Sequence, residues 1–168
     1  MNDSKNRVSP ISLAREALDH RRMKRFGSVA FNEAAEDLRT LGGAAALEAI
    51  EYVVERDLQS GTIDDSRRQG SHLGIGGLLV TYFAIVRACP EQTDRAVRFA
   101  QSLRGFLVED AIQAIWTVWL ANEDSRETPK GIVDWVVHIS EASSADSSAA
   151  KRFLRRYQER QASTGNEW

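Results

Sequence analysis

Two adjacent glycines, Gly42 and Gly43, separate two stretches of helical periodicity, and this arrangement constrains the fold more than any other feature of the sequence. Apolar residues recur at helical spacing over residues 31–41, before the glycines, and over residues 47–58, after them. Glycine disfavours a helix interior, and two helices joined by so short a connection must lie side by side and antiparallel. The sequence therefore predicts a helical hairpin.

Helical patterns continue on both sides of this hairpin. Ser9-Pro10 is typical of a helix start, because serine caps the first turn and proline has no N–H to leave unsatisfied, and Thr128-Pro129 repeats the signal. The expected helices span residues 10–26, 31–41, 47–58, 73–88, 93–103, 107–121, 128–139 and 147–161, with a polar loop over 60–72 and a serine-rich connector over 142–148. No stretch alternates apolar and polar residues for long enough to indicate a strand. The predicted fold class is all-α, with about eight helices packed as antiparallel hairpins.

Size and composition favour a single globular domain. A chain of 168 residues, 42% of them hydrophobic, buries roughly 70% of its unfolded surface and needs no metal or disulfide to fold. Cys89 is the only cysteine, which excludes a disulfide framework and a classical zinc finger. The N-terminus shows no secretory signal, and the longest apolar stretch is too short to cross a membrane. We expect one cytoplasmic domain over residues 1–168, flexible at 1–8 and 162–168, with no membrane partner.

The net charge of −2 averages three segments of different sign. Residues 1–26 carry +4, residues 27–150 carry −9, and residues 151–168 carry +3. The near-neutral total argues against a general nucleic-acid binder, which usually has a net positive charge. The basic ends either pack on the acidic middle or face separate partners.

Four residues are candidates for contact with a partner protein. Glu48, Glu51 and Glu55 lie along one edge of the helix over 47–58, beside its apolar face. Like charges at this spacing cost a few tenths of a kcal/mol per pair, so a lysine or arginine from a neighbouring helix, or a basic partner, is expected to offset them. Trp119 is the tryptophan for which we expect partial exposure, as at a binding hot spot.

The other large aromatic residues are assigned differently. Trp116 and Trp135 are expected to fill the core, which is the ordinary role of tryptophan in a helical domain. The contrast between these two residues and Trp119 can be tested directly by the burial of each side chain.

Basic residues form the candidate contacts for an anion or nucleic acid. Arg67 and Arg68 precede a glycine-rich helix start, where outward-pointing amides favour an anion. The last helix carries basic residues on one face, namely Lys151, Arg152, Arg155, Arg156 and Arg160. Five positive charges could contact phosphates with a strong dependence on salt, or they could dock against the acidic middle of the chain.

The sequence shows no arrangement typical of catalysis or metal binding. His20, His72 and His138 are far apart, and none belongs to a His-x-x-x-His or Glu-x-x-His pair. His138 lies one turn after Asp134, which indicates a surface pair rather than an acid–base site. We therefore expect no enzymatic activity, no cofactor and no metal.

Part of the chain resembles a known repeat family. The segment FNEAAEDLRTLGGAAALEAIEYVV has a small-residue first helix, a Leu-Gly turn and an apolar second helix, and is similar to one HEAT-type repeat. RGFLVEDAIQAIWTVWL, followed by the helix near Thr128, resembles a second copy. The resemblance to HEAT/armadillo-type proteins covers about half of the chain and implies a short stack of hairpins that binds another macromolecule. The long loop at 60–72 departs from a regular array, so an irregular helical bundle remains the alternative.

These features together favour binding over chemistry. We expect a non-enzymatic protein–protein interaction module, which is either an adaptor or an immunity protein whose acidic middle meets a basic toxin. The alternative is a nucleic-acid-binding helical protein that uses its basic terminal helices.

Overall fold

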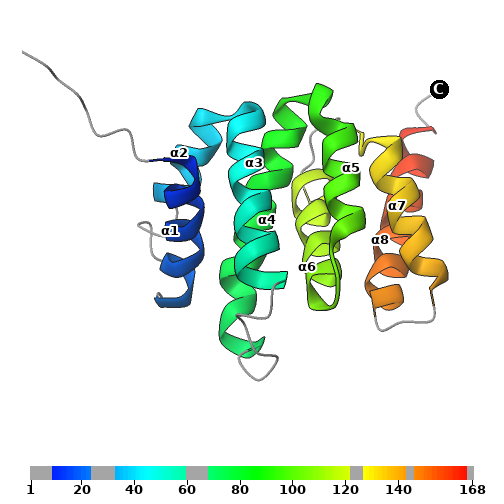
Figure 1. Cartoon of the computed structure of the whole chain (residues 1–168). Helices are drawn as coiled ribbons and strands as arrows, with labels where there is room; N and C mark the ends of the chain where they lie inside the picture. The colour runs from blue at the N-terminus through cyan, green and yellow to red at the C-terminus, as the bar shows by residue number, and fades with distance from the viewer. Residues whose placement is uncertain (1–8, 24–32, 60–67, 122–126, 143–145, 166–168) are drawn as a thin grey trace, which may run out of the picture. The chain divides into compact units, whose positions relative to one another are not determined.

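The computed structural model describes residues 9–23, 33–59, 68–121, 127–142 and 146–165, and all regular structure in these ranges is helical (Figure 1). The α-helices are α1 (Pro10–Met23), α2 (Glu33–Leu41), α3 (Gly43–Val53), α4 (Arg68–Ala88), α5 (Thr93–Ser102), α6 (Phe106–Ile115), α7 (Lys130–Glu141) and α8 (Asp146–Thr164). Two π-helices, η2 (Val54–Gln59) and η5 (Trp116–Leu120), continue α3 and α6, and a 3₁₀ turn, η4 (Pro90–Gln92), precedes α5. The predicted all-α class is confirmed. None of the described helices is both long and apolar enough to cross a membrane.

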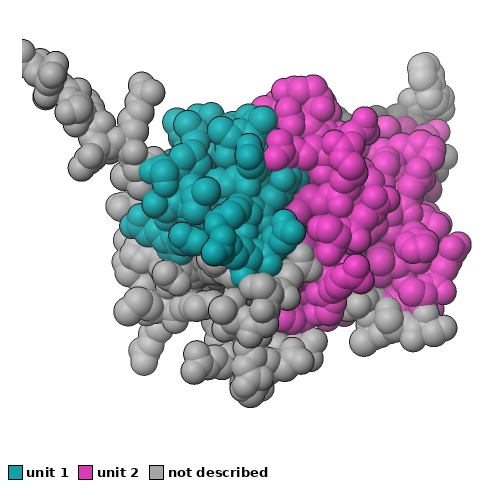
Figure 2. All heavy atoms as spheres, in the orientation of Figure 1, with its two compact units in different colours: residues 1–85 teal, residues 86–168 magenta. Residues whose placement is uncertain are grey.

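The chain forms two compact units, residues 1–85 and residues 86–168, with the division inside α4 (Figure 2). In unit 1, α1 packs against both α2 and α3. In unit 2, α5 packs against α7, α6 packs against α8, and α7 lies along α8. The pair α7–α8 is therefore the part of unit 2 on which both α5 and α6 pack.

Several helix boundaries differ from the prediction, among them the start of α3, which lies at Gly43 rather than at residue 47. The loop expected over 60–72 is shorter, because α4 already begins at Arg68; arginine and glutamine are good helix formers, and extending an existing helix costs little. The connector expected over 142–148 ends earlier, because α8 begins at Asp146. Residues 162–164, expected in a flexible tail, continue α8. The hydroxyls of Ser163 and Thr164 donate to carbonyls of the preceding turn, which supplies partners at the helix end. Residues 1–8 lie outside the described ranges.

Glycines with positive φ begin the second helix of each hairpin. Gly42 precedes α3 with φ 60° and ψ −172°, and Gly105 precedes α6 with φ 60° and ψ −139°. This region of backbone space is essentially restricted to glycine, since a Cβ is disfavoured there. The hairpin predicted from Gly42-Gly43 is thus present as α2 and α3.

The two hairpins share one pattern of burial, offset by 65 residues, as between Ala35 and Ala100. The buried residues of the first hairpin are Ala34, Ala35, Leu38, Ala46, Leu47, Ala49, Ile50, Val53 and Val54. Their counterparts, also all buried, are Phe99, Ala100, Leu103, Ala111, Ile112, Ala114, Ile115, Val118 and Trp119. The agreement does not extend through the turn, because Gly42 and Gly105 are 63 residues apart and because Leu107 and Val108 are buried where Gly42 and Gly43 are half-buried. The two segments therefore share a set of buried positions within their helices.

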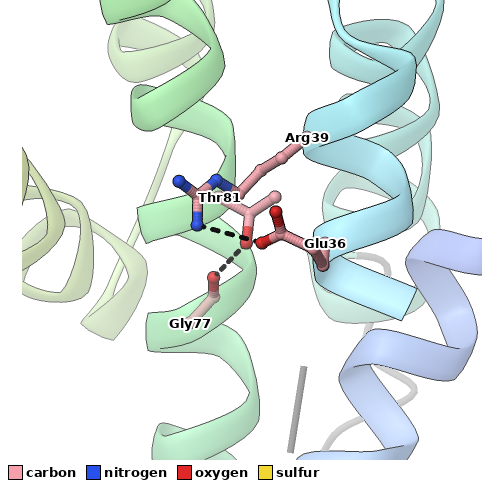
Figure 3. A network of polar contacts seen from close by, with 4 residues as sticks. All are labelled: Glu36, Arg39, Gly77 and Thr81. Atoms are coloured by element: carbon pink, nitrogen blue, oxygen red, sulfur yellow. Dashed lines mark hydrogen bonds and ion pairs between the residues drawn. The ribbon is translucent and has the colours of Figure 1, made fainter. Parts of the chain in front are cut away.

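Two polar residues are buried among those described, Thr81 and Thr128, and the first of them is satisfied within its own helix. Thr81 interrupts the apolar surface of α4, and its buried hydroxyl donates to the carbonyl of Gly77 at 2.9 Å (Figure 3). A side-chain to backbone bond of this kind lets a helix bury a hydroxyl without another partner. On α2, Arg39 donates to Glu36 at 3.2 Å in an exposed ion pair (Figure 3).

Of the two helix caps that the sequence predicts directly before a proline, the structure confirms only the one at Ser9. Ser9 caps α1 as expected, since its Oγ accepts a hydrogen bond from the amide of Ser12 at 3.2 Å. The cap predicted at Thr128 is wrong, because Pro129 itself occupies the N-cap position and no side chain caps α7. Thr128 is thus one residue too early to reach the first free amides. Its hydroxyl is buried and has no hydrogen-bond partner in the described part of the chain.

The buried hydroxyl of Thr128 is expected to destabilise the protein. Thr128→Val keeps the shape of the side chain and removes the unsatisfied group, so the free energy of unfolding should rise by about 1 kcal/mol. Thr93→Val is the matched control, because the Thr93 hydroxyl donates to the carbonyl of Pro90 at 2.7 Å and its removal should not stabilise. Urea denaturation followed by circular dichroism measures both. A Thr128→Val variant that loses as much stability as Thr93→Val would show that the hydroxyl has a partner.

Candidate partner-binding groove

The predicted acidic stripe is divided by a contact with α4. Glu48 and Glu55 are exposed, whereas Glu51 is half-buried and accepts a hydrogen bond from the Tyr82 hydroxyl at 2.7 Å. The Tyr82 side chain is fully buried, so its hydroxyl requires such a partner. A tyrosine from another helix therefore contacts the central carboxylate of the stripe.

Two arginines lie next to the same stripe. The guanidinium of Arg15 on α1 lies 5.8 Å from the ring centroid of Tyr52, and that of Arg56 lies 5.6 Å from it. Arg56 also donates to the Tyr52 hydroxyl at 2.8 Å. Because Tyr52 lies one helical turn after Glu48 and one before Glu55, positive charge lies beside the stripe. The stripe is therefore not a uniform negative surface.

The basic candidates separate into three groups. Arg67 lies outside the described residues, and the side chain of Arg68, at the start of α4, is not described either. Arg152 and Arg155 on α8 are exposed, as is Arg156, which pairs with Glu159 at 3.4 Å. The structure thus confirms an exposed basic face on α8, which we define as Lys151, Arg152, Arg155 and Arg156.

Arg160 does not belong to this basic face. Its guanidinium is turned inward and donates to the carbonyl of Trp119 at 2.6 Å. This carbonyl lies in the last turn of η5, where the helix leaves carbonyl groups without intrahelical partners. Arg160 therefore joins α8 to the end of η5 and has a structural contact within unit 2.

The expected exposures of Trp116 and Trp119 are reversed. Trp119 is only 2% exposed and lies in the core, so its predicted partial exposure is wrong, whereas Trp116 is half-buried. Trp135 is buried as predicted. Trp119 lies one turn after the fully buried Ile115 and shares its side of the helix, whereas Trp116 lies one turn after the exposed Gln113. The carbonyl of Trp116 accepts from the amide of Ala121 five residues later, as in a π-helical turn.

Trp116 lines a groove of about 330 Å³ between the α6–η5 helix and α8. The residues that line it are Ile112, Gln113, Trp116, Ala149 and Arg152. The indole meets the ring of Phe153 edge-on, with centroids 6.4 Å apart and an interplanar angle of 70°, and this contact holds it in place. The groove exists because α8 begins with small residues, and the methyl group of Ala149 does not fill the space opposite the indole.

The groove combines an apolar wall with polar groups at its edges. Ile112, Ala149 and the indole of Trp116 supply apolar surface, the amide of Gln113 can donate and accept, and the exposed guanidinium of Arg152 supplies positive charge. Its volume lies at the lower end of the roughly 300–1,000 Å³ that is typical of ligand pockets. Such a site can bind an apolar group that carries an anion close by.

The remaining polar candidates do not assemble into a reactive centre within the described ranges. His138 is exposed, and the carboxylate of Asp134, its predicted partner, accepts from Lys130 instead. For His20 and His72 the structure describes only helical backbone. No group of three or more His, Cys, Asp or Glu side chains is placed to hold a metal ion among the residues described.

Sequence reasoning missed the groove because its two walls come from separate helices. Gln113 and Trp116 are close on one helix, but Ala149 and Arg152 follow more than thirty residues later. The available signal was the run of small residues before Arg152, which implied space at the start of α8. Protein-family models, curated proteins and solved structures all gave no match to this chain.

Proposed function

We propose that the chain is a non-enzymatic protein–protein interaction module, and that the groove between the α6–η5 helix and α8 is its contact surface. The observation that carries this proposal is the half-buried Trp116, which lines a groove that the chain's own side chains leave open. Tryptophan and arginine are the residue types enriched at binding hot spots, and the groove has one of each, Trp116 and Arg152.

The helical packing of unit 2 supports the same function. Stacked helical hairpins form extended surfaces whose usual role is to bind another macromolecule. The packing of α5 on α7 and of α6 on α8 is a feature expected of a HEAT/armadillo-type protein. We propose this family type as the architectural basis of binding.

We place the contact in the groove rather than on the acidic stripe. If the chain were an immunity protein, Glu48, Glu51 and Glu55 would contact the surface of a basic toxin. Glu51 is engaged by Tyr82, and Arg15 and Arg56 lie beside it, so this surface offers a basic partner only Glu48 and Glu55. The adaptor form with the groove as its site is better supported.

The test is affinity capture of a partner by the full chain and two groove variants. Trp116→Ala removes the indole, and Ala149→Met fills the groove while leaving the indole in place. Trp116→Ala is expected to reduce the affinity for a given partner by about thirtyfold, because a central tryptophan typically contributes about 2 kcal/mol or more. Ala149→Met is expected to reduce it as well, because the added side chain occupies the groove. Thr117→Ala is the matched control, since Thr117 is the exposed neighbour of Trp116 and does not line the groove.

The outcomes are distinct if each variant is first shown by thermal unfolding to be folded. Capture that is lost in both groove variants and kept in Thr117→Ala supports the proposed site. A folded Ala149→Met variant that captures the same partner as well as the unchanged chain contradicts it.

Single-stranded nucleic acid is the second candidate for the groove. Although the basic positions of α8 have no aromatic residue between them in the sequence, the fold brings Trp116 next to Arg152. A base could stack on the indole while phosphates contact the basic face. Binding of an oligonucleotide measured at increasing salt distinguishes this function from protein binding, because phosphate contacts weaken steeply with salt.

A further inference from the structure

We infer that the groove between the α6–η5 helix and α8 takes an acidic segment of the partner protein, with one apolar side chain seated against Trp116 and a neighbouring carboxylate paired with Arg152. This inference rests on the proposed function and specifies the chemistry of the partner. It reverses the sign of the partner expected from the acidic middle of the sequence, because the exposed groove edge is basic.

The charges around the groove favour an anion on the α8 side. Arg152 lines the groove, and Lys151 and Arg155 are exposed on the same helix. Arg156 is also exposed, and Glu159 is the carboxylate paired with it, one turn further along α8. A guanidinium that lies beside an apolar wall can bind a carboxylate through two parallel hydrogen bonds. The α8 edge therefore selects negative charge and repels a basic segment.

The α6 side of the groove has a different character. Gln113 is neutral, and Glu109, one turn earlier on the same face of α6, is exposed. A carboxylate of the partner is therefore attracted to the α8 edge and repelled from the start of α6. This asymmetry favours a carboxylate of the segment at the α8 edge of the groove.

The apolar wall sets the size of the anchoring side chain. Ile112 is buried beneath the groove, Ala149 is nearly so, and Trp116 presents its half-buried indole. At about 330 Å³ the groove has room for one large apolar side chain, such as phenylalanine or leucine, and the atoms next to it. It is too small to take the full apolar face of a helix. A short extended or helical segment with a single apolar anchor between acidic residues fits these dimensions.

The inference is tested by fluorescence anisotropy with the full chain and labelled synthetic peptides. The main probe is a short glutamate-rich peptide with one central phenylalanine. Two matched peptides replace either the phenylalanine by serine or the glutamates by lysine, and a short oligothymidylate tests for nucleic acid. The acidic phenylalanine peptide is expected to bind, and each matched peptide to bind about tenfold more weakly or not at all.

The variant arm uses two charge reversals in unit 2. Arg152→Glu should weaken binding of the acidic peptide by about tenfold, because it replaces an attraction by a repulsion. Arg98→Glu is the control, since Arg98 is exposed on α5 and does not line the groove. Both positions are exposed, so both variants are expected to fold.

Three results would overturn the inference: equal affinity of the Arg152→Glu and Arg98→Glu variants for the acidic peptide, equal binding of the lysine peptide, or tighter binding of the oligothymidylate that depends on Arg152. Failure of the inference is separable from failure of the proposed function. If a captured partner depends on Trp116 but not on Arg152, the groove binds protein and the acidic chemistry is wrong. If capture depends on neither residue, the proposed function itself is contradicted.

Discussion

Replacement of Phe153 by alanine is expected to lower the free energy of unfolding by about 3–5 kcal/mol, the largest effect of any single substitution considered for unit 2. The side chain of Phe153 is fully buried on the inner face of α8. Its ring meets Trp116 edge-on at 6.4 Å and stacks on Tyr157 at 6.4 Å with an interplanar angle of 9°. The substitution therefore removes a large apolar side chain and leaves a cavity between α8 and the α6–η5 helix.

Urea denaturation, followed by circular dichroism and by tryptophan fluorescence, measures this loss. Leu154→Ala is the matched control, because Leu154 is the next residue on α8 but is only half-buried, so its truncation should cost less. A Phe153→Ala variant no less stable than Leu154→Ala would show that α8 does not pack on α6 in this way. Tryptophan fluorescence reports directly on this region, because the ring of Phe153 contacts the indole of Trp116.

Replacement of Gly105 by alanine is expected to lower the free energy of unfolding by about 1–3 kcal/mol through the backbone alone. Gly105 has φ 60° before α6, and a Cβ added there would meet no other atom within 4 Å. The expected cost is therefore conformational rather than steric. At Gly42, which has the same φ before α3, an added Cβ would lie 3.5 Å from the Arg39 carbonyl oxygen, so Gly105 isolates the conformational cost more cleanly.

Gly76 provides the opposite expectation within the same protein. It lies inside α4, where its added Cβ would also meet nothing within 4 Å, and its φ is not positive. Gly76→Ala should therefore raise the free energy of unfolding by up to about 1 kcal/mol, since alanine is the better helix former. The midpoints of thermal and urea unfolding should therefore rise for Gly76→Ala and fall for Gly105→Ala. If Gly105→Ala is as stable as the unchanged chain, the turn before α6 does not require a positive φ.

Much of the fold could be predicted because its determinants are local. Helical spacing of apolar residues and the Gly42-Gly43 pair were enough for the helices and the first hairpin. The prediction was wrong at helix ends, where the local preferences for helix and for loop are of similar strength. The start of α4 at Arg68 and the failure of Thr128 as a cap depend on how far a helix extends into a polar segment, which propensities of a few tenths of a kcal/mol do not fix.

The candidate site could be predicted only in part. The sequence indicated the exposed basic residues Arg152, Arg155 and Arg156, and the structure confirms that they are exposed. It did not indicate which tryptophan lies beside them, because the helix expected over residues 107–121 is apolar around more than half of its circumference and its pattern does not show which residue meets α8. In the structure Trp119 lies in the core and Trp116 is half-buried.

The sequence by itself determined the all-α class, the helical hairpins and the charge of each segment, because each depends on residues within one or two turns of one another. Only the tertiary structure decided which charges are compensated and where a surface is left open. Tyr82 reaches Glu51 from another helix, Arg160 reaches the carbonyl of Trp119, and Ala149 is too small to fill the space beside Trp116. These outcomes depend on the distance between side chains of packed helices, and a helical pattern shows which face is apolar but not which residue it meets.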